Sequence, residues 1–108
     1  MDAEKMEKSL IVTVSGRMDA LSAPEFEKKV GGWMDEGETN FIIDLGMLDY
    51  ISSAGLRSML ILTKELKAKD RQLLLAALKD TVQEVFEISG FSSIIPICKS
   101  VEAAIKQI

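Results

Sequence analysis

Two adjacent serines, Ser52 and Ser53, are the side chains of this sequence that are best placed to do chemistry. They stand between an acidic stretch and an apolar segment of helical periodicity, so a helix is expected to begin at this pair. The first turn of a helix has backbone N–H groups without partners and the positive end of the helix dipole. A serine there can cap the helix with its hydroxyl, or it can be phosphorylated and hold the phosphate against those N–H groups. Both roles stay open for Ser53, and Ser52 competes for either.

Three aspartates are expected near these serines. Asp44 ends a predicted strand, where open α/β sheets place their functional residues, and Asp49 follows in the adjoining loop. Asp19 follows the preceding strand and is expected close by. Ordinary loop carboxylates give the same pattern. Three acids can also bind a divalent cation, but their spacing matches no specific metal motif, so no metal site is predicted.

The sequence lacks the residues of the common catalytic sites. It has no histidine, which removes the most frequent general base and metal ligand and excludes a Ser-His pair within the chain. The loop before Ser53 has neither the phosphate-binding GxxxxGK[ST] pattern nor the GxSxG nucleophile pattern. These absences argue against a hydrolase or a nucleotide-binding protein. The single cysteine, Cys98, is expected to be a small buried apolar side chain.

Size and composition indicate one domain, residues 1–108, with a substantial hydrophobic core. Hydrophobic residues make up 47% of the 108 residues, which argues against disorder. The formal net charge is -4 and no basic cluster occurs, so nucleic acid is not an expected partner. The longest apolar runs are far shorter than the roughly 20 residues that span a bilayer, and no signal sequence is recognisable. We expect a cytoplasmic protein that does not bind a membrane.

Apolar patterns predict alternating strands and helices. Strands are predicted at residues 10–15, 41–45, 72–77 and 94–98, with a short edge strand within residues 1–8, and helices at residues 23–35, 53–66, 81–89 and after Ser100. The unbroken apolar run of residues 41–45 is typical of a strand buried on both faces, as in a parallel sheet. Pro96 favours an edge position for the last strand. An α/β fold with a mainly parallel sheet of four or five strands follows from this alternation.

Three local features of the helices are also predicted. Ser22, Pro24 and Glu25 have the spacing of a capping box at the start of the first helix. The pair Gly31-Gly32 inside that helix lowers its propensity, and close packing is the one reason that the sequence suggests for it. The helix after the serine pair is expected to bury Leu56, Met59, Leu60, Thr63 and Leu66, and Ile61 and Leu62 are expected to broaden this apolar face and pack on a neighbouring helix.

Three segments resemble motifs of STAS domains, and in particular of bacterial anti-sigma factor antagonists. Asp44-Leu45 followed by residues 48–56 resembles the DL…hxxhDSSGL signature, in which h is an apolar residue. Residues 14–19 resemble an earlier hxGxhD segment, and Ser89-Gly90-Phe91 with the two isoleucines that follow resembles a late SGhxxhh segment. The three occur in the expected order and cover almost the whole chain. The Ser-Ser-Ala-Gly-Leu segment is the most specific of them.

The resemblance implies successive βα units with about four helices mostly on one face of the sheet. It also implies a partner switch rather than an enzyme. The unmodified antagonist binds an anti-sigma factor that is itself a serine/threonine kinase, and so frees the sigma factor. Phosphorylation of one serine of the antagonist by that kinase ends the complex, and a metal-dependent serine phosphatase reverses the modification. No cofactor is implied, and a monomer or weak dimer is expected.

The resemblance places the phosphorylated residue at Ser53, with Ser52 as the alternative. The family's preceding aspartate falls on Ser52 and its following serine or threonine falls on Ala54, so this chain departs from the pattern on both sides. The family's earlier aspartate, associated with the binding surface, falls on Asp19. A STAS module of another signalling or membrane-transport assembly, with no need of phosphorylation, is the alternative function. Partner contacts are expected at Asp19, Asp49, Ser52, Ser53, Ala54 and Gly55.

Overall fold

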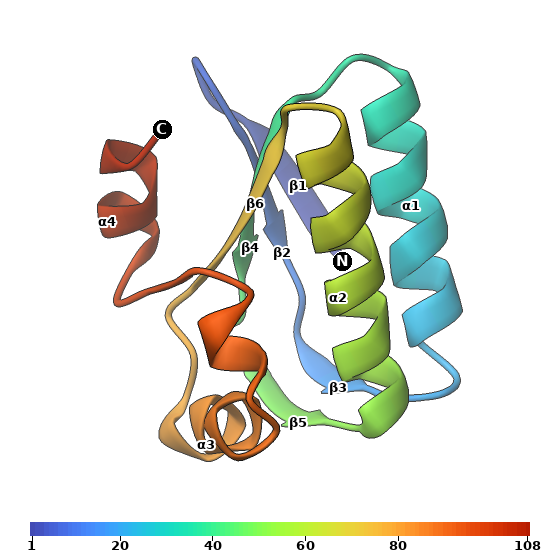
Figure 1. The fold of residues 1–108 in the computed structure, drawn as a ribbon, viewed down its shortest axis with the longest axis vertical. Helices are drawn as coiled ribbons and strands as arrows, with labels where there is room; N and C mark the ends of the chain where they lie inside the picture. The colour runs from blue at the N-terminus through green and yellow to red at the C-terminus, as the bar shows by residue number, and fades with distance from the viewer.

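A five-stranded sheet forms the centre of the computed structural model, which describes all residues 1–108 (Figure 1). Its strand order is β1-β2-β4-β6-β7. β1 is antiparallel to β2, and every other pair of neighbours is parallel. The predicted α/β fold with a mainly parallel sheet is therefore confirmed. The strands span Asp2–Lys5 (β1), Leu10–Thr13 (β2), Asn40–Asp44 (β4), Gln72–Ala76 (β6) and Ile97–Cys98 (β7).

The central strand β4 is buried on both faces, as its apolar sequence predicted. Phe41, Ile42 and Ile43 are 0% exposed, and they pair with β2 on one side and β6 on the other. The edge strand β1 is exposed at all four of its positions. Lys5 on β1 forms an ion pair with Glu38, which fastens this edge strand to the segment that leads into β4.

The last strand is shorter than predicted. Only Ile97 and Cys98 pair with β6, because Ile94 ends a short 3-10 helix and Pro96 has no N–H to donate to a neighbouring strand. Pro96 instead accepts a hydrogen bond from Leu75 N through its carbonyl oxygen (2.9 Å). The expected edge position of this strand is confirmed.

Helices cover the two faces of the sheet unequally. α1 and α2 lie side by side on one face, and α4 lies on the opposite face (Figure 1). The larger hydrophobic cluster joins the first face to α1, α2 and α3, whereas a smaller cluster of six buried residues joins the second face to α4. Most helices therefore pack on one face, as expected. The helices span Ala23–Asp35 (α1), Ser53–Ala68 (α2), Asp80–Ile88 (α3) and Val101–Lys106 (α4), with a 3-10 helix at Phe91–Ser93 (η1).

A second, two-stranded parallel sheet was not predicted. It pairs β3 (Gly16–Met18) with β5 (Leu48–Ile51). The strand predicted over residues 10–15 is confirmed at residues 10–13 but ends two residues early, and Gly16, with a φ of 77°, turns the chain toward β5. The prediction of a loop before the serine pair was wrong. Leu48 and Ile51 are buried while the two residues between them are exposed, so β5 lacks the strict alternation by which strands are recognised.

The predicted capping box at the start of α1 does not form. Ser22 occupies the N-cap position but makes no capping hydrogen bond with its side chain. Its hydroxyl donates to Arg17 O (2.9 Å) and accepts from Asp19 N (2.9 Å) instead. Asp19 accepts the hydrogen bonds of the N–H groups just before the helix, and Glu25 pairs with Lys29 at 3.5 Å. The turn is therefore organised by the aspartate rather than by the serine and glutamate.

The buried face of α2 differs from the prediction at two positions. Leu62 is buried as expected, as are the other predicted residues Leu56, Met59, Thr63 and Leu66, but Leu60 is half-buried and Ile61 is 38% exposed. The apolar residues of this helix exceed what one face can bury, so the sequence pattern alone left the exact face ambiguous.

The glycine pair in α1 has no packing role, contrary to the prediction. A Cβ atom added to Gly31 or Gly32 meets nothing within 4 Å. Glycine in the interior of a helix only adds conformational freedom to the unfolded chain.

Replacing Gly32 by alanine is therefore expected to raise the free energy of unfolding by about 0.5–1 kcal/mol, measured by urea denaturation. The matched control is Gly37→Ala, which also has open space around it but has a φ of 105°. This control should lower the stability, because alanine is strained in that region. An unchanged or lowered stability for Gly32→Ala would mean that Gly32 does have a packing or conformational role in α1.

Candidate functional site

The small sheet brings the Asp19 loop and the serine pair together. Arg17 pairs with Tyr50 and Met18 pairs with Ile51 in the parallel ladder. The carboxyl ends of both strands therefore lie at the same edge, where Asp19 follows β3 and Ser52 follows β5. The backbone N–H of Ser52 donates to Met18 O at 2.8 Å, which continues the pairing past the end of the strand. Two segments more than thirty residues apart thus form one surface.

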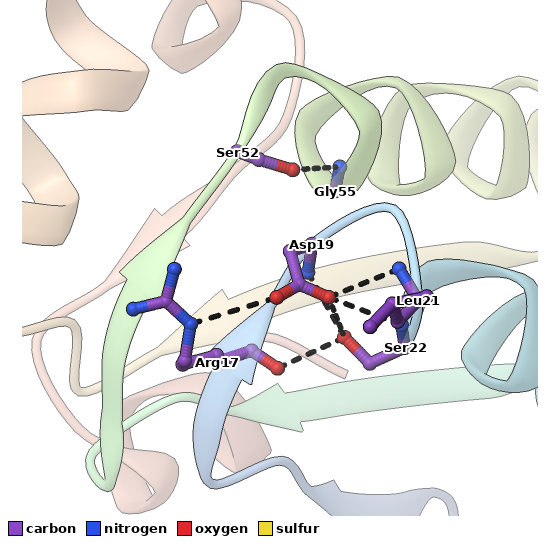
Figure 2. A network of polar contacts seen from close by, with 6 residues as sticks. All are labelled: Arg17, Asp19, Leu21, Ser22, Ser52 and Gly55. Atoms are coloured by element: carbon purple, nitrogen blue, oxygen red, sulfur yellow. Dashed lines mark hydrogen bonds and ion pairs between the residues drawn. The ribbon is translucent and has the colours of Figure 1, made fainter.

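Ser52 is the residue that caps α2. Its backbone is extended (φ −92°, ψ 175°), and its hydroxyl accepts a hydrogen bond from Gly55 N at 3.3 Å (Figure 2). Its carbonyl oxygen accepts the first helical bond, from Leu56 N at 2.9 Å. Ser52 is also partly buried. Between the two candidate serines, the structure therefore assigns the capping role to Ser52.

Ser53 is the first residue of α2 and is exposed. Its hydroxyl makes no hydrogen bond within the chain, whereas that of its neighbour Ser52 is engaged. The N-cap role considered for Ser53 is thus wrong. The hydroxyl of Ser53 is free, accessible to a partner, and located at the positive end of the α2 dipole. Its phosphorylation stays a prediction.

Asp19 organises the loop beside the serine pair (Figure 2). Its Oδ1 atom accepts hydrogen bonds from Leu21 N (3.0 Å), Ser22 N (3.2 Å) and Ser22 Oγ (3.3 Å), and its Oδ2 atom lies 3.5 Å from Arg17 Nε. The backbone N–H groups of Leu21 and then Ser22 lower the pKa of the carboxyl group. Asp19 is therefore ionised, and its charge is used to shape its own loop.

The exposed side of the small sheet carries charges that are already paired. Arg17 lies over the ring of Tyr50, with 4.2 Å from its guanidinium carbon to the ring centroid. Asp49 on β5 forms an ion pair with Lys79, which precedes α3. Because Arg17 also contacts Asp19, each of the two acids nearest this sheet has a basic neighbour. The surface around the serines is therefore close to electrically balanced.

The third predicted aspartate does not join the others. Asp44 accepts a hydrogen bond from Gly46 N at 3.0 Å and closes the turn between β4 and β5. No group of three or more His, Cys, Asp or Glu side chains converges anywhere in the chain in the way that a metal site requires. Cys98 is buried, as predicted, and its burial raises the pKa of the thiol. No helix of the chain combines the length and the apolar character needed to cross a membrane.

Gly55 allows α2 to approach β3 closely. A Cβ atom at this position would lie 2.6 Å from Met18 Cγ, 2.7 Å from Met18 O and 2.8 Å from Ile51 Cγ1. Gly55 is buried and Ala54 is partly buried, so a partner reaches these two predicted contact residues less easily than the exposed Ser53 and Asp49. Gly55 has a packing role, because even the Cβ atom of an alanine would overlap its neighbours.

Two exposed residues at this site were missed by the sequence argument. Leu21, at the tip of the Asp19 loop, is 91% exposed, and Tyr50 on β5 is 43% exposed. The sequence held one weak indication of this exposure: Leu21 lies in a predicted turn between an aspartate and a serine. A leucine is more often buried in the core than exposed, so this position alone did not predict exposure. Leu21 and Tyr50 thus give this surface two large exposed side chains that a protein partner can cover.

Replacing Gly55 by alanine is expected to lower the free energy of unfolding by about 1–3 kcal/mol, because the added methyl group overlaps backbone as well as side-chain atoms. Urea denaturation measures the effect. Gly32→Ala is the matched control, since it adds the same methyl group to a helix with free space around it. Equal stability changes for the two variants contradict the close approach of α2 to β3.

The carboxyl group of Asp19 is expected to titrate below its ordinary pKa of 3.8. The folded protein favours the charged form, so the resulting stability is present above the ordinary value and is lost as the pH falls through the lowered pKa. Carboxyl-carbon NMR titration measures this pKa directly. In Asp19→Asn the acid-side loss of stability should be smaller. A pKa at or above 3.8 for Asp19 contradicts the hydrogen-bond network drawn in Figure 2.

Comparisons with known proteins agree with this geometry. The sequence matches the STAS domain family over residues 1–104. It is 45% identical over 101 residues to BtrV of Bordetella bronchiseptica, a protein assigned as an anti-sigma factor antagonist, and this covers 94% of the chain and 87% of BtrV.

Solved structures give the same fold. A Thermotoga maritima protein assigned as an anti-sigma factor antagonist superposes with a TM-score of 0.94 at 16% identity, covering 99% of this chain and 92% of that one. The phosphorylated form of the Bacillus protein SpoIIAA superposes with a TM-score of 0.76 at 21% identity, covering 98% and 96%. The chain belongs to the STAS domain family, and the relatives it resembles are anti-sigma factor antagonists.

Proposed function

We propose that this chain is an anti-sigma factor antagonist whose binding to an anti-sigma kinase is ended by phosphorylation of Ser53. One observation carries the proposal: the exposed Ser53 hydroxyl stands unbonded at the start of α2, while Ser52 beside it caps the helix. A kinase can therefore modify Ser53 without removing the helix cap. The chain then acts as the substrate of an enzyme and is not itself an enzyme.

The isolated domain can accept a phosphate at this position. A phosphoserine carries about −1.5 to −2 charge, and the first turn of α2 offers backbone N–H groups and a positive dipole end to it. Arg57 lies four residues along the same helix, a spacing at which opposite charges attract. Modification is therefore expected to leave the fold intact.

The same charge opposes a complex that covers the site. Asp19 and Asp49 already have Arg17 and Lys79 as their basic neighbours, so Arg57 and the helix N-terminus are what this surface offers a dianionic phosphate, and they do not neutralise it completely. Burying a charge without a partner costs several kcal/mol, whereas a tenfold loss of affinity needs only about 1.4 kcal/mol. Phosphorylation of Ser53 can thus end binding without any change of fold.

The relatives support two parts of this proposal, an anti-sigma factor as the partner and phosphorylation as the modification. BtrV is assigned as an antagonist of an anti-sigma factor, and SpoIIAA has been solved in both an unphosphorylated and a phosphorylated form. For this chain we propose a serine/threonine kinase of the anti-sigma type as the partner, and a metal-dependent serine phosphatase as the enzyme that restores Ser53. The exchange then takes place in the cytoplasm, where sigma factors act.

A pull-down from the source cell tests the binding half of the proposal. Wild type, Ser53→Asp and the neutral, similarly sized Ser53→Asn are immobilised side by side, and retained proteins are identified by mass spectrometry. Wild type and Ser53→Asn should retain the same kinase, and Ser53→Asp should bind it at least about tenfold more weakly because of its charge. Equal retention by all three variants contradicts the electrostatic switch.

Incubation of the purified kinase and ATP with the chain tests the acceptor. Intact mass should show one added phosphate on wild type and none on Ser53→Ala. A phosphorylated Ser53→Ala protein moves the acceptor to Ser52 or elsewhere. If the retained assembly contains no kinase and wild type gains no phosphate, the chain is instead a STAS module that works without phosphorylation.

A further inference from the structure

A groove opens between α1 and α2 directly beside Ser53. The two helices run side by side (Figure 1), and the groove between their first turns has a volume of about 190 Å³. Apolar side chains line part of it, among them Ala20, Ala54 and Ile61. Ala20 follows Asp19 in the chain, and Ala54 follows Ser53. Ser53 itself does not line the groove, but Arg57, four residues further along α2 and thus on the same side of the helix, does.

The size of the groove favours a protein side chain as its occupant. Sites for small molecules and cofactors usually enclose about 300–1,000 Å³ and cover most of the ligand. This groove is smaller than that range and is open to the surface. One apolar side chain of a partner protein fits a hollow of this kind, as interface anchors do.

Ser58 supplies a polar group that lacks a partner inside the chain. The residue is only 3% exposed, lines the groove, and makes no hydrogen bond with its side chain. Thr63 on the same helix behaves differently, because its hydroxyl donates to Met59 O at 2.8 Å. No side-chain oxygen that is cut off from solvent lacks a hydrogen-bond partner in this chain. The Ser58 hydroxyl therefore still reaches solvent at the groove, where a partner can bond it in place of water.

The two charged residues of the groove are also without ion pairs. Glu27 comes from α1 and Arg57 from α2, and neither belongs to any of the four salt bridges of the chain. Arg17 and Lys79 of the small-sheet surface, in contrast, are already paired. Unpaired charged groups and apolar surface thus occur together in the groove.

We propose that this groove is a second contact site for the anti-sigma kinase, which inserts one apolar side chain there and hydrogen-bonds Ser58 through its backbone. We expect a basic residue of the kinase to pair with Glu27 and an acidic residue to pair with Arg57, so that the charges of the two surfaces are complementary. The inference rests on the proposed function. A standard interface covers about 800 Å² of each partner, out of 6003 Å² for this chain. A partner centred on Ser53 must therefore extend past the serine loop.

The groove and the serine then have separate tasks. Phosphorylation adds charge at Ser53 but does not alter Ser58 or Ile61, one and two turns further along α2. Ser58 and Ile61 can contact the kinase in either state, whereas a phosphate on Ser53 attracts Arg57 and so weakens the charged part of the groove contact. Ser53 decides whether the complex persists. Specificity between similar kinases is expected to follow the residues of the groove.

Isothermal titration calorimetry with the purified kinase retained by wild type tests the proposal. Ile61→Glu should weaken binding at least about tenfold, because it places an ionised group against the inserted side chain. Ser58→Ala should weaken it about threefold to tenfold, the usual effect of one lost hydrogen bond. The matched control is Ile88→Glu, an equally non-conservative change on α3 at a position that is 79% exposed. Binding by this control should stay within about twofold of wild type.

Thermal unfolding of each variant separates loss of binding from loss of fold. Alanine is a better helix former than serine, so Ser58→Ala is expected to stay folded. If Ile61→Glu binds the kinase as wild type does while Ser53→Asp does not, the groove proposal is overturned and the proposed function stands. If Ile61→Glu alters only self-association of the chain in sedimentation, a second copy is the occupant and the proposal is wrong. If wild type binds no kinase, both are wrong.

Discussion

The backbone contact between α2 and β3 at Gly55 fixes the geometry on which the rest of this site depends. Gly55 faces Met18 so closely that no side chain fits between them, and the N–H of Ser52 bonds the carbonyl oxygen of Met18 in the same place. These contacts lock the start of the helix to the Asp19 loop. Functional groups that are held by regular elements keep a more constant geometry than groups on a free loop. The exposed serine is therefore displayed in one fixed position.

Division of tasks between neighbouring residues is the main principle of this surface. The Ser52 hydroxyl bonds a backbone N–H of the first turn of α2, and the Ser53 hydroxyl remains free. Modification of Ser53 therefore leaves the helix cap at Ser52 in place. Asp19 similarly uses its charge to build the turn that exposes Leu21. A surface of this kind is stable without its partner, because the groups that build the helix start and the Asp19 loop are hydrogen-bonded within the chain, and the free groups remain in contact with solvent.

Sequence patterns were sufficient where structure is decided locally, and insufficient where it is decided by pairing across the chain. The apolar run of β4 and the serine pair before α2 predicted the central strand and the start of the helix correctly. The strands β3 and β5 were missed because each is short and is stabilised by the other. Either serine could cap α2 by local rules, and the hydrogen bond from Ser52 N to Met18 O, which continues the strand pairing up to Ser52, fixes where the helix begins. The exposure of Leu21 could not be predicted, since a leucine is equally compatible with the core.

The exposed edge strand β1 has a consequence for how the protein behaves at high concentration. Unpaired strand edges are templates for adding strands from other molecules, and charged side chains on them oppose such stacking. β1 presents Asp2, Glu4 and Lys5 along the free edge of the sheet, and the ion pair of Lys5 with Glu38 keeps the strand anchored. The fold thereby discourages sheet-to-sheet polymerisation at its least protected border.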